Sequence, residues 1–199
     1  MSHGFFALIS RMKYIRRWGL MRNSQHENIQ EHSHMVAVLA HALAVISRDI
    51  FDMECDPNLC ASIALFHDAS EIITGDLPTP IKYQNSEIMS AYHMVEETAS
   101  KKLVNMLPVE MRNAYLQLFK QKVCNDEKTL VKAADKLSAY IKCIEERKAG
   151  NNEFISAERQ IKNALNGYDI PAIKYFLETF MPAFELTLDE LGTLESEEI

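Results

Sequence analysis

Apolar residues recur at intervals of three and four positions through almost the whole chain, and this spacing constrains the fold more than any other feature. Such spacing places side chains on one face of an α-helix. It predicts helices over residues 4–15, 28–47, 57–75, 86–107, 109–122, 125–150, 153–165 and 172–181. No segment shows the two-residue alternation that is typical of a strand. We therefore predict an all-α fold, a compact helical bundle.

Length and charge restrict the classes of protein. At 199 residues with 47% hydrophobic content, the chain is long enough to bury one core, which predicts a single domain over 1–199. We expect the acidic tail after about residue 188 to be frayed. The net charge of −7 argues against a nucleic-acid partner, which would require a basic face.

The cysteines and the N-terminal segment bear on location. Four cysteines occur without any CxxC pair, which is typical of reduced thiols. The apolar run over 5–9 is too short to span a bilayer, and basic residues follow it at once. We find no signal sequence, and we expect a cytoplasmic protein that does not contact a membrane.

A histidine and an aspartate stand side by side near the end of the predicted helix 57–75. On a continuous helix His67 and Glu71 share a face, and Asp68 borders that face. These groups are costly to bury unless a cation lies between them. Imidazole and carboxylate ligands suit first-row divalent metals. Alternatively, the pair lies by chance on a surface helix.

Two other predicted helices carry polar residues in unexpected places. His32 lies on the apolar face near the start of the helix 28–47, whereas His34 and His41 fall on its other faces and are interpreted as surface or interhelical residues. Asp135 interrupts the apolar stripe of the helix 125–150. Together with the histidine–aspartate pair, these residues are anomalous polar groups on three different predicted helices.

Two segments between the predicted helices have no helical spacing, and both contain residues of interest. Residues 16–23 hold three arginines and the sole tryptophan, Trp18, and Gly19 would permit a tight turn there. The arginines could instead be solvated, and Trp18 could be a core anchor. Residues 76–80 contain two prolines, each of which restricts the residue before it. We predict a rigid extended loop adjacent to the face shared by His67 and Glu71.

The ordered set of histidine, histidine–aspartate and aspartate resembles the metal-binding signature of the HD-domain phosphohydrolases. Within that superfamily the chain is similar to the bacterial 5′-deoxynucleotidases. The stretches that carry the resemblance are 16–23, 31–33, 67–71, 74–80 and 133–137. The resemblance extends from about residue 5 to residue 188, and it implies an HD-type domain.

This resemblance implies one divalent cation. Its expected ligands are His32, His67, Asp68 and Asp135. Co, Mn, Fe or Zn ions suit two imidazoles and two carboxylates better than Mg does. A second metal is not implied, because no additional histidine pair follows the His–Asp motif. A homodimer is also expected from the resemblance.

The resemblance further implies removal of the 5′-phosphate from 2′-deoxyribonucleoside monophosphates by in-line attack of a metal-activated water. Glu71 would orient or deprotonate that water and Asp76 would protonate the departing oxygen, or the two roles are exchanged. Arg17 would grip the phosphate in a bidentate manner. The residues expected at the substrate are Arg17, Trp18, His32, Asp68, Asp76, Leu77, Pro78, Thr79 and Asp135.

Two alternatives stay open at this point. The chain could be another HD phosphohydrolase, acting on nucleoside triphosphates, cyclic nucleotides or alarmones. It could also be a sensor that binds metal and nucleotide without catalysis. Phosphate release from nucleoside mono-, di- and triphosphates under a set of divalent metals separates all three.

Overall fold

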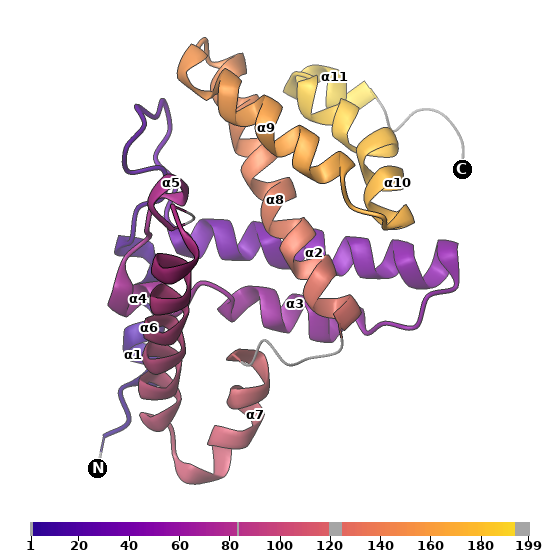
Figure 1. Ribbon diagram of the computed structural model, residues 1–199. Coiled ribbons are helices and arrows are strands. Elements are labelled where there is room, and N and C mark those ends of the chain that lie inside the picture. The colour runs from indigo at the N-terminus through magenta and orange to yellow at the C-terminus, as the bar shows by residue number, and fades with distance from the viewer. Residues whose placement is uncertain (1, 83, 120–124, 194–199) are drawn as a thin grey trace.

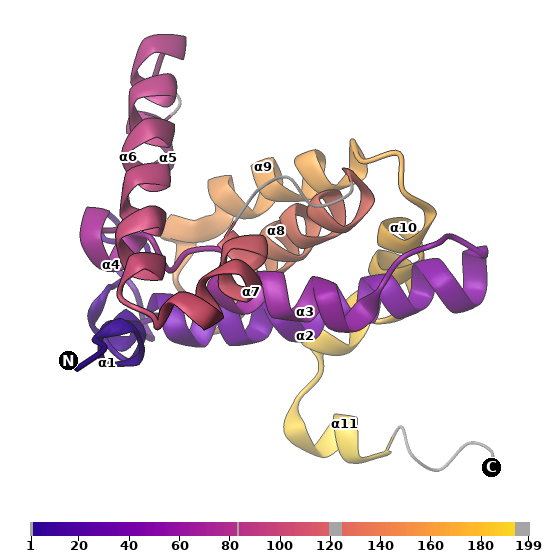
Figure 2. The ribbon, with the colours of Figure 1, turned by 90° about the horizontal axis from the view of Figure 1, so that it is seen from below.

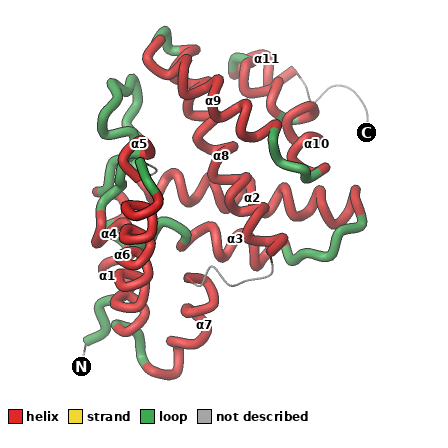
Figure 3. Tube along the Cα trace, in the orientation of Figure 1, coloured by secondary structure: helices red, strands yellow, loops and turns green. Residues whose placement is uncertain are grey.

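The computed structural model describes residues 2–82, 84–119 and 125–193, and these fold almost entirely into helices (Figures 1 and 3). This part of the chain contains no strand beyond one isolated antiparallel bridge between Arg16 and Asn28. The predicted all-α class is confirmed.

The elements have the following bounds in chain order. The α-helices are α1 Phe5–Ile9, α2 Ile29–Phe51, α3 Pro57–Phe66, α4 Glu71–Thr74, α5 Thr79–Lys82, α6 Ser86–Asn105, α7 Val109–Phe119, α8 Asn125–Lys148, α9 Ile155–Asn166, α10 Pro171–Thr179 and α11 Leu188–Thr193. Three 3₁₀ turns cover Met12–Tyr14, Asn152–Phe154 and Met181–Glu185.

Helix α2 is the central element, lying along α3 while α8 crosses both (Figure 1). A capping box starts it: the Asn28 side chain accepts from the backbone N–H groups of Gln30 and Glu31, and the Glu31 side chain accepts from the Asn28 backbone. Its buried face, which includes Val36 and Leu43, joins residues of α3, α8 and α10 in one hydrophobic cluster. This packing fixes the position of the first turn of α2, which carries a predicted metal ligand.

By length and composition alone, α2 could cross a membrane, with a mean hydropathy of 1.4 over its most apolar window. Yet 44% of that window is buried inside the protein, against other helices. Such burial is typical of a core helix. The segment is therefore weak evidence for a membrane partner.

A second hydrophobic cluster lies beneath the connection between α3 and α4. Its buried members are Phe5, Met12, Ile29, Ala69, Leu103 and Leu107. The aromatic rings of Phe66, Tyr115 and Phe119 pack around Phe5 at centroid distances of 5.0–6.4 Å. Since Ala69 belongs to this cluster, the turn next to the predicted metal ligands is anchored on a second core.

The predicted continuous helix over 57–75 is wrong. Helix α3 ends at Phe66, turns follow, and α4 resumes only at Glu71. The reason is that His67 Nδ1 lies 2.6 Å from the Ala64 carbonyl oxygen, the acceptor that a continuous helix would offer to the next backbone N–H. Helix α4 ends at Thr74, and Gly75 caps it with a φ of +73°, a conformation that favours glycine.

Other boundaries also differ from the predictions. The first helix ends at Ile9 rather than near residue 15, and a 3₁₀ turn follows. The loop over 76–80 is not extended throughout, because α5 begins at Thr79; Pro80 is tolerated in its first turn, where a backbone N–H has no partner in the helix. The tail expected to fray after residue 188 forms α11, while residues 194–199 lie outside the described part.

A buried carboxylate on α8 fastens the loop that precedes α2. Glu146, only 1% exposed, accepts from the backbone N–H groups of Ser24 and Gln25 at 2.8 and 3.2 Å. Lys142 Nζ donates to Glu146 at 2.5 Å and to the Gln25 carbonyl at 2.6 Å. Asn151 also donates to Glu146. The loop that carries the arginines is thereby held to the body of the protein.

We expect Glu146→Ala to lower the free energy of unfolding by about 3–5 kcal/mol, because it leaves the buried Lys142 ammonium without its counter-charge. The control Glu153→Ala removes an ion pair with the exposed Arg22 and should cost at most about 1 kcal/mol. Urea denaturation measures both values. Equal losses in the two variants would contradict the anchoring role of Glu146.

This contribution of Glu146 should also depend on pH. Burial would raise its pKa, but the hydrogen bonds from Lys142, Ser24 and Asn151 outweigh burial and hold the pKa well below its usual range. The stabilisation is therefore complete above the ordinary glutamate pKa, and it is lost as pH falls toward the lowered folded-state pKa.

Candidate metal centre and active site

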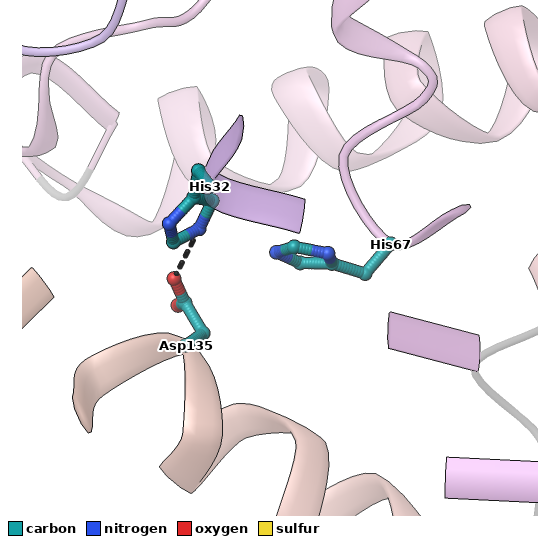
Figure 4. Close-up of side chains that lie close together, drawn as sticks. All are labelled: His32, His67 and Asp135. Carbon is teal, nitrogen blue, oxygen red and sulfur yellow. Dashed lines mark ion pairs between the residues drawn. The ribbon is translucent and has the colours of Figure 1, made fainter. Parts of the chain in front are cut away.

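Three side chains from separate segments converge on one point (Figure 4). His32 comes from α2, His67 from the turn after α3, and Asp135 from α8. One ligand atom from each lies within 4.8 Å of the others. His32 Nε2 is 3.0 Å from Asp135 Oδ1, and the two imidazole centroids are 5.3 Å apart. These residues form a possible metal site, as the sequence predicted.

Both imidazole rings are oriented from behind. His32 Nδ1 lies 3.1 Å from the Ser138 hydroxyl, and His67 Nδ1 lies 2.6 Å from the Ala64 carbonyl. These contacts direct both Nε2 atoms to the centre. There, both atoms are buried and neither makes a hydrogen bond of acceptable geometry within the described residues. An imidazole nitrogen in this situation fits a metal ion.

Asp68 extends the donor set. Its Oδ2 atom lies 3.1 Å from His67 Nε2 and 3.6 Å from His32 Nε2. Burial alone would raise the pKa of Asp68, but His67 and then His32 hold that pKa below its usual range. Asp135 behaves likewise, with His32 as the largest lowering influence on its pKa. Two charged carboxylates thus face two imidazoles, a combination suited to divalent first-row metals.

The charge of His67 responds to the same carboxylates. Burial by itself would lower the pKa of His67, but the adjacent Asp68 and the nearby Asp135 raise that pKa to about 9. A proton therefore occupies the ring when no cation balances the carboxylates. A metal held by these residues would take the place of that proton, which would couple metal binding to proton release.

Glu71 stands at the start of α4 with 7% of its surface exposed. Its Oε2 atom is buried, with no hydrogen-bond partner among the described residues. Burial, followed by repulsion from Asp68 and Asp76, raises the pKa of Glu71 to about 9. Burial likewise raises the pKa of Asp76, just beyond the end of α4. Both carboxyl groups are therefore biased toward holding a proton beside the metal centre.

The side chain of Arg17 extends from the loop before α2 toward the metal centre. Its Nη2 atom is 3.9 Å from Asp135 Oδ1, while Nη1 pairs with Glu27 Oε2 at 2.6 Å. The side chain is only 14% exposed, so the alternative of a solvated arginine is wrong here. Arg16 and Arg22, by contrast, are exposed.

Trp18 occupies a strained turn next to this arginine. The sequence suggested that Gly19 would permit the tight turn. In the structure the left-handed residue is Trp18 instead, with a φ of +58°. Its Nε1 atom donates to Glu27 Oε2 at 3.0 Å, and its ring packs on Phe154 with centroids 5.2 Å apart. The indole is half-buried and is held on two sides.

Known proteins match the chain over nearly its full length. Residues 4–184 match the family described as 5′-deoxynucleotidase YfbR-like. The chain belongs to this family. A 5′-deoxynucleotidase of Yersinia pseudotuberculosis is 49% identical over 193 residues, covering 96% of this chain and 98% of that protein. The 5′-deoxynucleotidase YfbR of Escherichia coli is 48% identical over 192 residues, covering 96% of each.

Solved structures agree with this family assignment. An HD-domain phosphohydrolase from Listeria innocua has a TM-score of 0.80 and 25% identity, with 96% of both chains covered. A cyanophage S-2L HD phosphohydrolase, solved with dA and one catalytic Zn²⁺ ion, has a TM-score of 0.65 and 20% identity, covering 91% of this chain and 96% of that one; it supports the fold. The predicted superfamily and enzyme class, a phosphomonoester hydrolase, are confirmed.

The remaining predicted residues of this YfbR-like protein are placed as follows. Leu77 and Pro78 are half-buried between α4 and α5. The backbone of Thr79 starts α5, and its side chain lies outside the described part. His34 and His41 are exposed on α2 and away from the metal centre, as predicted.

Two residues of the site escaped sequence reasoning. Glu27 joins Arg17 to Trp18, and Ser138 orients His32. Glu27 lies in an irregular loop, where no periodicity assigns a side chain to a face. Ser138 lies three residues after Asp135 on α8, so it shares the face of a predicted ligand; this spacing was the available signal.

Proposed function

We propose that this YfbR-like protein hydrolyses 2′-deoxyribonucleoside 5′-monophosphates at one divalent cation held by His32, His67, Asp68 and Asp135. The observation that carries the proposal is the pair of buried imidazole nitrogens that lie 3.0 and 3.1 Å from two carboxylates without a hydrogen bond of acceptable geometry among the described residues. Zn, Mn, Co or Fe suits these ligands better than Mg. When bound, such a cation lowers the pKa of a coordinated water and offsets phosphate charge.

The substrate phosphate is bound by Arg17, whose Nη2 edge faces the metal centre. The segment after α4, formed by Leu77, Pro78 and Thr79, lines the nucleoside. Trp18, adjoining Arg17 in the chain, closes the sugar pocket. Phosphate binding and sugar contact thereby come from consecutive residues of one loop.

Glu71 and Asp76 perform the two proton transfers. One carboxyl group takes a proton from the attacking water, and the other gives a proton to the departing 5′-oxygen. Burial raises the pKa of both groups, and a raised pKa is typical of carboxyl groups that transfer protons in catalysis.

Phosphate release tests this function directly. The purified protein, loaded separately with Mn²⁺, Co²⁺, Zn²⁺ or Mg²⁺, is assayed with deoxynucleoside mono-, di- and triphosphates. We expect release from the monophosphates, and little from the longer substrates. Preference for triphosphates would favour another HD phosphohydrolase activity, and binding without release under every metal would favour a sensor.

The sugar preference gives a separate prediction. A bulky, fixed side chain beside C2′ rejects an added hydroxyl by steric overlap and by desolvation without a partner, whereas an apolar pocket alone gives only about 10²-fold. We expect Trp18→Ala to narrow the ratio of kcat/KM between a deoxynucleotide and its ribonucleotide. If Trp18 were only a core anchor, the variant would lose about 3–5 kcal/mol of stability and keep its sugar preference.

The protein is further proposed to be a cytoplasmic homodimer. Met94 and Val95 are 62% and 51% exposed on α6, whose N-terminal part projects beyond the body of the protein with only the short helix α5 beside it (Figure 2). An exposed apolar surface of this kind is typical of an interface. Free thiols at Cys60 and Cys143 suit a reducing compartment. Light scattering of the purified protein measures the oligomeric mass.

A further inference from the structure

One carboxylate oxygen of Glu27, in the loop before α2, accepts hydrogen bonds from two side chains that are adjacent in the sequence. Glu27 Oε2 lies 2.6 Å from Arg17 Nη1 and 3.0 Å from Trp18 Nε1. The backbone reinforces this pairing, because the Arg17 N–H donates to the Glu27 carbonyl at 3.0 Å. The side chains of Glu27 and Arg17 are 15% and 14% exposed. A charge-assisted pair that is largely shielded from water is stronger than a surface pair.

The contact also determines where the guanidinium points. Arg17 lies 3.9 Å from Asp135, and both Asp135 and Asp68 act on its charge. Without Glu27, the fork of the guanidinium would be free to pair bidentately with a carboxylate of the metal centre. Such a pair would compete with both the cation and the phosphate. Glu27 therefore holds one edge of Arg17 on the side away from the metal centre.

The same oxygen restrains the indole. Trp18 adopts a left-handed backbone conformation, which is unfavourable for a non-glycine residue and persists only where the surroundings enforce it. Phe154 packs against the ring, and Arg17 Cζ lies 5.7 Å from its centroid. The hydrogen bond from Nε1 to Glu27 adds a directional contact to this packing, and it fixes which edge of the ring faces the carboxylate.

We propose that Glu27 is a positioning residue that makes phosphate binding and sugar selection interdependent, by holding Arg17 and Trp18 in one rigid arrangement. The inference rests on the roles proposed above for Arg17 and Trp18. Glu27 does not touch the substrate, and it acts through the two side chains that do.

The test is the kinetics of Glu27→Ala with a deoxynucleoside monophosphate and its ribonucleotide. Removal of hydrogen bonds to a charged group should raise KM for the deoxynucleotide by roughly 10- to 100-fold. The deoxy-to-ribo ratio of kcat/KM should fall in the same variant. Metal content, measured by mass spectrometry, should be unchanged. A purely structural role would lower kcat/KM for both substrates by one common factor, and that result would overturn the proposal.

A conservative variant separates the two contacts. Glu27→Gln keeps an oxygen that accepts from the Trp18 N–H, but it removes the charge that pairs with Arg17. We expect its KM to rise while its sugar ratio stays within about threefold of that of the unsubstituted protein. Because the substitution is nearly isosteric, it also keeps the proposal testable if Glu27→Ala does not fold. Loss of the sugar ratio with an unchanged KM would contradict the assignment.

Two further variants serve as controls. Glu153→Ala breaks the pair between Glu153, in the 3₁₀ turn Asn152–Phe154, and the exposed Arg22 of the same loop, and it should change neither KM nor the ratio. Trp18→Phe keeps an aromatic ring and lacks the N–H. Trp18→Phe should change the sugar ratio less in the Glu27→Ala background than in the otherwise unsubstituted protein, because the two substitutions remove the same hydrogen bond. Additive effects would overturn the proposed coupling.

The experiment distinguishes failure of the proposed deoxynucleotidase function from failure of the proposed role of Glu27. If the unsubstituted protein showed no deoxynucleotide preference, the sugar-selecting role of Trp18 would fail, and the interdependence would fail with it. If that preference were present and persisted in Glu27→Ala with an unchanged KM, only the role of Glu27 would be overturned.

Discussion

Asp135→Ala is expected to abolish phosphate release and to remove the bound metal. Asp135 supplies one of two carboxylates at the centre, and its Oδ1 atom is 3.0 Å from His32 Nε2. Since a catalytic cation contributes several kcal/mol of charge stabilisation, we expect turnover to fall by more than about 10³-fold. Metal analysis and phosphate release, measured on the same preparation, test both parts.

Two matched variants delimit this result. Asp49→Ala removes an exposed carboxylate paired with Arg48 and should leave metal content and turnover intact. Ser138→Ala removes the hydroxyl behind His32 and should weaken metal affinity by roughly 10- to 100-fold, the range typical of groups that orient a ligand. Full metal occupancy in Asp135→Ala would remove this residue from the ligand set.

Glu71→Ala is expected to lower kcat by roughly 10²- to 10⁴-fold, the range for a group that transfers a proton. The buried Oε2 atom has no hydrogen-bond partner among the described residues, and the pKa of the group is raised to about 9. Both properties are typical of a catalytic carboxyl group. Single-turnover kinetics with saturating deoxynucleotide measure the loss.

The metal and the substrate should still bind to this variant. Glu71→Gln, nearly isosteric with the protonated side chain, is the stricter version: it should retain metal content and KM while losing turnover. Loss of metal together with activity would instead make Glu71 a ligand. Full activity in Glu71→Gln would leave Asp76 as the group that transfers the essential proton.

The sequence alone was sufficient for the all-α class and for most of the helices, and it identified His32 and Asp135 as candidate metal ligands. Helical spacing identified α2 and α8 because each buries one continuous apolar face. His32 and Asp135 were recognisable because burying a polar group in such a face is costly without a partner. That argument depends only on local periodicity, and it needed no knowledge of how the helices pack.

The break between α3 and α4 depended on tertiary packing. Local spacing predicted a continuous helix through Glu71, but the His67 ring takes the Ala64 carbonyl and Ala69 belongs to a cluster with Phe5 and Leu103. A tertiary cluster and one side-chain contact outweigh helical propensity, which amounts to only tenths of a kcal/mol per residue. Glu71 therefore reaches the site from a new helix.

The conformation of the irregular loop before α2 depended most strongly on tertiary structure. Its contacts join residues far apart in the chain: Glu146 binds the backbone of Ser24 across 122 positions. Glu27 reaches Arg17 and Trp18 only because the chain reverses between them. A loop has no repeating geometry from which the direction of a side chain follows. Periodicity thus identified His32 and Asp135 as candidate ligands, and folding of the loop onto α8 decided that Arg17 lies 3.9 Å from Asp135.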